Sequence, residues 1–172
     1  QRQMCIRDSR YVAQVAGRTG EAAGREKAIS ESRSNILITL DSDDLNHPQR
    51  AARCYELLKV PTPRLLYTRV HLFSSSNPSG RPKPVFQPFN TKLLEMVNFI
   101  TNPGTAFNRE AYIAAGSHYD TSLELATDYD QFLRMARAGV SIIGLDEVHV
   151  SYRKHAGAVT SGAGDALHNA VM

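Results

Sequence analysis

The residues with the clearest capacity for chemistry are three aspartates within four positions, Asp41, Asp43 and Asp44. They directly follow the apolar run 36–40 (ILITL), whose composition is typical of a strand buried on both faces of a sheet. Carboxylates this close repel one another unless a cation joins them, and Mg2+ and Mn2+ prefer such oxygen ligands. Because ligand sites in open α/β sheets lie beyond the carboxyl ends of strands, the pattern predicts a divalent metal site.

Other interpretations of the aspartates remain open. The structural one is an Asp-rich turn that caps a helix beginning near Pro48, with Asp44 or Asn46 as the capping residue. A phosphohydrolase of the haloacid dehalogenase type is the enzymatic alternative, with Asp41 as the phosphate-accepting nucleophile, although Leu45 stands where that family usually has Thr. An EF-hand loop is excluded, because its required Gly and Glu are replaced by Asn and Ala.

The elements around the aspartates alternate between helix and strand. Helix-forming residues occupy 20–33 and 48–59, and β-forming residues occupy 36–40 and 65–73. This order predicts an α/β fold with a mainly parallel sheet and helices on both faces. On the second helix, helical spacing predicts a buried face formed by Ala51, Ala52, Tyr55 and Leu58.

The second half of the chain begins with a segment rich in Ser, Pro and Gly, 74–88, which we expect to be a long surface loop of the kind that binds ligands. Asn102-Pro103-Gly104 predicts a turn. Further along, the pattern predicts helices over 109–115 and 126–138 and strands over 141–145 and 148–152.

Four segments, in order, resemble family-2 glycosyltransferases. Residues 25–58, REKAISESRSNILITLDSDDLNHPQRAARCYELL, resemble the family's central segment. The stretches ITNPGTAFNREAYIAAGSHYD, LATDYDQFLRMARAG and VHVSYRKHAGAVT resemble its acceptor-side segment, its acidic helix and its closing strand. The resemblance implies a GT-A fold and transfer of a sugar, with inversion, from a nucleotide-diphosphate donor to an acceptor hydroxyl.

The resemblance also implies roles for individual residues. Asp43 and Asp44 would hold Mg2+ or Mn2+, and Asp41 would face the ribose or support the metal ligands. Asp128 would be the general base that accepts the proton of the acceptor hydroxyl, with Asp130 structural. The competing interpretation makes Thr127-Asp128 a helix N-cap and a first-turn carboxylate.

Three residues near the end of the closing strand complete the implied site. His155 lies where some family members supply a further metal ligand, and a solvated loop histidine is the alternative. Arg153 and Lys154 would contact the diphosphate, or form an ordinary exposed basic pair. The expected partners are a nucleotide-diphospho-sugar donor and a sugar or lipid-linked acceptor.

The chain departs from the family at its start. Residues 1–9 fit nothing that follows and are expected to be a non-native leader, with a partial GT-A domain over 10–160 and a mobile tail over 161–172. The family's opening strands, which hold the nucleotide base, have no counterpart, so we expect this chain by itself to be inactive. An inert or merely binding remnant of a glycosyltransferase domain is the alternative to the enzyme. The processive signature Gln-x-x-Arg-Trp is absent because the chain has no Trp, which favours single addition, with bacterial cell-envelope polysaccharide as the expected product class.

Composition sets the remaining limits. The chain has 172 residues, 42% hydrophobic and 22% charged, which is typical of one globular domain. Its net charge of +3 is spread along the chain and does not indicate nucleic-acid binding. Cys5 and Cys54 lie too far apart in sequence for a zinc knuckle, and there is no signal peptide or membrane-spanning stretch. We expect a cytoplasmic protein, for which peripheral membrane contact remains open.

Overall fold

The computed structural model describes residues 20–83 and 85–157. The expected leader, the expected tail and Cys5 lie outside these ranges, so those expectations stay untested. In chain order the elements are α1 (Glu21–Glu31), β1 (Ile36–Ile38), β2 (Leu45–Asn46), α2 (Arg50–Leu58), β3 (Arg64–Ser74), β4 (Arg81–Pro82), α3 (Thr91–Met96), a 3-10 turn (Asn102–Gly104), β5 (Thr105–Asn108), α4 (Arg109–Ala114), α5 (Thr127–Arg137) and β6 (Ser141–Lys154).

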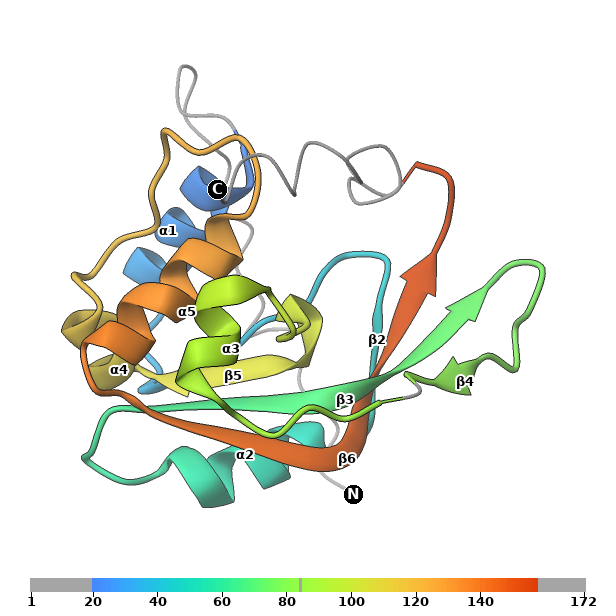
Figure 1. Cartoon of the computed structure of the whole chain (residues 1–172), viewed down its shortest axis with the longest axis horizontal. Coiled ribbons are helices and arrows are strands. Elements are labelled where there is room, and N and C mark those ends of the chain that lie inside the picture. The colour runs from blue at the N-terminus through green and yellow to red at the C-terminus, as the bar shows by residue number, and fades with distance from the viewer. Residues whose placement is uncertain (1–19, 84, 158–172) are drawn as a thin grey trace.

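One mixed sheet with the order β1-β5-β3-β6-β2 joins the strands, and β4 pairs with β3 (Figure 1). The longest pairing is the parallel one between β3 and β6, which runs from Arg64 opposite Ser141 to Ser74 opposite Lys154. Strand β5 is antiparallel to both β1 and β3, so β1, β3 and β6 share one direction. The predicted α/β class is confirmed, and strands β2, β4 and β5 run opposite to these three.

Helices cover both faces of the sheet because its strands present apolar side chains alternately to each face. Leu65 and Tyr67 of β3 belong to the larger apolar cluster, whereas Leu66 between them belongs to the smaller one. Helices α1, α3, α4 and α5 contribute to the larger cluster, and α2 contributes Cys54 and Leu58 to the smaller one. Figure 1 shows α2 on the side of the sheet opposite to the other four helices.

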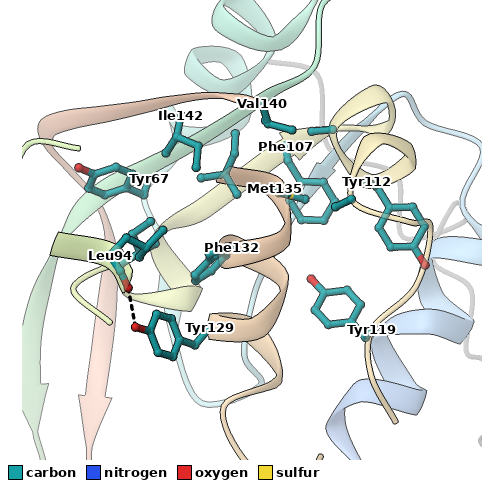
Figure 2. Packing of buried hydrophobic residues seen from close by; sticks show 14 of the residues in the cluster. Tyr67, Leu94, Phe107, Tyr112, Tyr119, Tyr129, Phe132, Met135, Val140 and Ile142 are labelled. Atoms are coloured by element: carbon teal, nitrogen blue, oxygen red, sulfur yellow. Dashed lines mark hydrogen bonds between the residues drawn. The ribbon is translucent and has the colours of Figure 1, made fainter. Parts of the chain in front are cut away.

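The larger cluster fixes helix α5 against the sheet. Phe132 and Met135, both buried, pack with residues of β3, β5 and β6. The Tyr129 hydroxyl donates a hydrogen bond of 2.5 Å to the carbonyl of Leu94, which ties α5 to α3 (Figure 2). The start of α5, where Asp128 lies, is therefore held by packing along the rest of the helix.

Of the four residues expected on the buried face of helix α2, only Leu58 is buried. Ala51, Ala52 and Tyr55 are exposed, and the face toward the sheet consists of Arg50, Cys54 and Leu58. The apolar spacing was misleading because the helix turns a charged residue inward, where Arg50 meets backbone carbonyls. Cys54 is a free, buried cysteine.

Three further predictions are modified. The segment 74–88 is not one long loop, because β4 folds back on β3 and leaves a short hairpin turn with Gly80 in the left-handed region. The two strands predicted over 141–145 and 148–152 form the single strand β6, which is irregular where Asp146 and Glu147 interrupt its register with β3. Strand β5 and helix α3 were not predicted. None of the helices in the described ranges has the length and apolar character that crossing a bilayer requires.

Candidate active site

The acidic loop, residues 41–44, lies beyond the carboxyl end of β1, as the sequence predicts. Thr39 anchors it: its amide donates to the carbonyl of Thr105 (3.2 Å), and its hydroxyl lies 2.7 Å from the carbonyl of Asn102. The amide of Asp44 donates to the carbonyl of Asp41 (3.2 Å), which closes the loop into a turn. The loop is thus attached to the segment 102–105 on one side and to β1 on the other.

Arg50 is buried beside the acidic loop and donates hydrogen bonds to residues on both sides of it. Its side chain is almost fully buried, at 2% exposure, and donates to the carbonyls of Pro103 (2.5 Å) and Thr105 (2.9 Å) and to the side chain of Asn46. Burial lowers the pKa of this guanidinium, and the nearby carboxylates of Asp44 and Asp41 act in the opposite direction. Arg50 is therefore a buried positive charge behind the acidic loop.

Asp44 is the aspartate that the fold surrounds most closely. One carboxylate oxygen accepts the backbone N–H of Arg153 (2.8 Å), and the other is buried with no hydrogen-bond partner among the described residues. Burial raises the pKa of Asp44 to about 6, with the charges of Asp43 and Asp41 adding to the rise. The capping interpretation is wrong, because α2 has Gln49 at its N-cap and no side-chain capping bond.

Asp43 and His155 come together although they are 112 positions apart in the sequence. The His155 Nε2 atom lies 2.8 Å from an Asp43 carboxylate oxygen, and this hydrogen bond lowers the pKa of Asp43. Arg153 donates from its Nε to the Asp43 carbonyl (2.9 Å), and its guanidinium lies over the ring of Phe73. Lys154 is exposed and lies over the ring of Tyr152, away from these contacts.

Asp128 lies in the first turn of α5. The helix has Ala126 at its N-cap, in the left-handed region at φ 59°, and no side chain caps it. The predicted N-cap role of Thr127 is therefore wrong. The Asp128 carboxylate accepts the N–H of Tyr129 (2.9 Å), and burial raises its pKa. Asp130 instead forms an ion pair with Arg134 at 2.9 Å, one turn along the same helix.

Arg25 of α1 lies between these two groups of carboxylates, and the sequence analysis did not single it out. It forms an ion pair with Glu21, lies 4.0 Å from an Asp41 oxygen and donates to the Thr127 hydroxyl (3.3 Å). Burial raises the pKa of Asp41, and repulsion from Asp43 and Asp128 raises it further. Nothing in the letters distinguishes Arg25 from Arg33 on the same predicted helix, since only the docking of α1 against α5 gives it these neighbours.

The donor atoms fit a divalent cation in their chemistry. An unpaired buried carboxylate oxygen on Asp44 is costly, and a cation would satisfy it. Mutual repulsion among Asp41, Asp43 and Asp44 has the same remedy. Within residues 20–83 and 85–157, however, no three His, Cys, Asp or Glu side chains are arranged to hold a metal ion by themselves. A bound cation would thus need oxygen ligands from a second molecule.

The fold is that of an α/β protein, and the acidic loop beyond the end of β1 lies at the edge of the sheet where such proteins have their ligand sites. The sequence profile of glycosyl transferase family 2 matches residues 6–116, and the chain belongs to this family. Its mixed α/β architecture agrees with the GT-A fold, and its activity class is sugar transfer from a nucleotide-sugar. No curated protein matches the chain.

The matched range includes Arg25 and the acidic loop but ends before α5. The roles of Asp128, Arg153, Lys154 and His155 are therefore proposals. Membership in this family gives no support to the phosphohydrolase alternative with Asp41 as nucleophile.

Proposed function

We propose that this domain serves metal-dependent, inverting transfer of a sugar from a nucleotide-diphosphate donor to an acceptor hydroxyl. The observation that carries the proposal is the contact of His155 with Asp43 beside the unsatisfied carboxylate oxygen of Asp44. Family membership supplies the reaction class. The donor is a nucleotide-diphospho-sugar and the acceptor a sugar or a lipid-linked acceptor.

On this proposal Asp43, Asp44 and His155 would hold Mg2+ or Mn2+ together with oxygen atoms of the donor diphosphate. The ion supplies Lewis-acid stabilisation of the charge that grows on the departing diphosphate. The buried free oxygen of Asp44 is its best-prepared ligand, because no other group in the described residues satisfies it. Arg153 keeps Asp43 and Asp44 in place through two hydrogen bonds, and exposed Lys154 is available to a phosphate oxygen.

Asp128 is the proposed general base. A base works best when its pKa approaches the working pH, and burial raises the pKa of Asp128 in that direction. It lies near enough to Asp41 for its charge to raise the pKa of that carboxyl, which sets the base beside the acidic loop. The acceptor hydroxyl would give its proton to Asp128 as it attacks the anomeric carbon from the side opposite to the diphosphate.

The binding half of the proposal is tested by calorimetry with Mn2+ and inorganic diphosphate mixed beforehand, a probe that needs no nucleotide-base pocket. We expect wild type to bind the mixture and Asp43→Ala to bind it at least about tenfold more weakly, the order of loss seen when a metal site is disturbed. Asp146→Ala is the matched control, because Asp146 is a half-exposed carboxylate paired with Arg69 on the irregular part of β6. Equal heats for wild type and Asp43→Ala would remove the metal site from the proposal.

A further inference from the structure

Arg25 is placed to do more than stabilise its own helix. Its side chain is only 15% exposed and makes contacts with three separate parts of the chain. It lies 4.0 Å from Asp41 at the end of β1 and donates to the hydroxyl of Thr127 at the start of α5. Its guanidinium also lies over the ring of Tyr119, 5.6 Å from the ring centre, in the segment between α4 and α5.

The charges around Arg25 make it the counter-ion of a carboxylate cluster. Glu21, Asp41 and Asp128 surround it: Asp41 and Asp128 both raise the pKa of Glu21, and Asp128 also raises the pKa of Asp41. Arg25 is also the one cation, among the groups that the structure describes, that lowers the pKa of Asp128. The remaining titratable neighbour is Tyr119, whose pKa Asp128 raises and Arg25 lowers. Without Arg25 these carboxylates would repel one another with no cation between them.

The start of α5 needs such a support. Ala126 adopts a left-handed conformation that a residue with a Cβ rarely takes, and no side chain caps the helix. Thr127, 2% exposed, follows it and receives the hydrogen bond of Arg25. The position of Asp128 thus depends on contacts that reach it from α1 and not only on α5 itself.

We propose that Arg25 is a positioning residue that fixes the place of Asp128, at the start of α5, relative to Asp41 of the acidic loop. This inference rests on the proposed base role of Asp128 for its functional meaning. Arg25 acts through its hydrogen bond to Thr127, its stacking on Tyr119 and the attraction of its positive charge for Asp128. Arg suits the task because its planar fork can donate to Glu21 and Thr127 while its face stacks on Tyr119, which a lysine ammonium cannot reproduce.

The test uses the full chain and does not need turnover. The carboxyl carbon of Asp128 is followed by NMR through a pH titration in wild type and in Arg25→Gln. We expect the titration midpoint of Asp128 to rise by about one pH unit in the variant, the lower end of what loss of an adjacent opposite charge causes. Arg25→Lys keeps the charge and should restore most of the midpoint.

Arg109→Gln is the matched control. Arg109 also holds this part of the chain, because it donates to the carbonyls of Ser32 and Ser34, which directly follow α1. None of its hydrogen bonds within the described residues reaches the carboxylate cluster. This variant should lower stability and leave the Asp128 midpoint unchanged. An unchanged midpoint in Arg25→Gln, or the same shift in Arg109→Gln, would overturn the positioning role.

Kinetics separate this inference from the proposed function wherever transfer is measurable. Arg25→Gln should lower kcat by about tenfold or more, with little change in the KM for the donor, and Arg25→Lys should recover only part of kcat. If Asp128→Asn leaves transfer intact while the midpoint still moves in Arg25→Gln, the base role fails and the positioning contact stands. If the midpoint does not move, the positioning contact fails whatever the kinetics give.

Discussion

At the scale of a single residue, the two carboxylate oxygens of Asp44 have environments with opposite effects on its pKa. One of its oxygens is held by a backbone N–H, which favours the carboxylate, while burial of the other favours the protonated acid. Burial is the larger effect, so in the absence of a cation the folded protein holds a proton on Asp44 more tightly than the unfolded chain does. This has a measurable consequence for stability.

The first prediction concerns pH. Because the folded pKa of Asp44 is about 6 and its ordinary value is 3.8, the folded state binds more protons between these values. Its free energy of unfolding should therefore fall as pH rises through this window and stay low above it. Compared with Asp44→Asn, which does not titrate, wild type should lose on the order of 2 kcal/mol between pH 4 and pH 7. Urea unfolding without divalent ions measures the difference. A difference that does not change with pH would contradict the assigned pKa.

The second prediction separates Asp128 from Asp130 on the same helix. Asp128→Asn preserves size but cannot accept a proton, so wherever transfer is measurable it should fall by about 10²–10⁴-fold with donor affinity little changed. Asp130→Asn makes the same charge change in a residue that is paired with Arg134, and it should leave transfer near wild type. Donor consumption across a panel of nucleotide-sugars measures both. Loss of transfer in Asp130→Asn alone would mean that the base is misassigned.

At the scale of elements, the Asn108 side chain joins β5 to the start of β3, to the start of α4 and to the connection before β3. Its side-chain oxygen Oδ1 accepts the backbone N–H groups of Arg64 (2.8 Å) and Ala111 (3.1 Å). Arg64 is the first residue of β3, and Ala111 lies in the first turn of α4. The Asn108 amide donates to the carbonyls of Val60 (3.1 Å) and Thr62 (2.7 Å) in the connection before β3. The side chain is completely buried, so water cannot replace these bonds.

The third prediction follows. Asn108→Ala should lower the free energy of unfolding by roughly 2–4 kcal/mol, because it removes a helix cap and leaves buried backbone groups unpaired. Asn90→Ala is the control, since Asn90 caps α3 through a single exposed bond to Leu93 and should cost only about 1 kcal/mol. Denaturant unfolding of both variants makes the comparison. Equal losses would show that the bonds to Val60 and Thr62 contribute nothing.

The elements were predicted well where local sequence pattern determines them, and poorly where contacts with residues distant in sequence determine them. Helices α1, α4 and α5 and strands β1 and β3 lie close to their predicted ranges, because propensity and turn residues agree there. The buried face of α2 was missed because Arg50 turns inward only to meet the carbonyls of Pro103 and Thr105, which are distant in sequence. Strand β5 was missed because it has only four residues, between a turn and a helix, which is too few to show the alternation of a strand.

The same limit applies to the site. The cluster of Asp41, Asp43 and Asp44 is visible in the letters, because three carboxylates in four residues are unusual. The contact of His155 with Asp43 was anticipated only through the family resemblance. Arg25 could not be found, because its role arises from the packing of α1 against α5 and the loop before it.

At the scale of the whole molecule, a cation held between Asp43 and His155 would connect segments that lie 112 positions apart in the sequence. The fourth prediction is that Mn2+ with inorganic diphosphate stabilises the whole fold. At one hundred times the dissociation constant the gain is about 2.7 kcal/mol, which for a chain of this size is on the order of 5–10 °C in Tm. Asp43→Ala should show little of this rise, and calorimetric scanning compares the two. The same rise in both proteins would place the ligand elsewhere.

The pairing of β3 with β6 also governs when this protein can fold. Strand β3 is complete once residue 74 has left the ribosome, but its longest partner ends at residue 154. Until then one edge of a strand with several buried apolar side chains lacks its partner. Pairing of this kind is slow, because a long connecting chain must be ordered before any contact compensates for it. The nascent chain should therefore depend on chaperones while residues 75–140 are being made, and cooperative structure should appear only after β6 emerges.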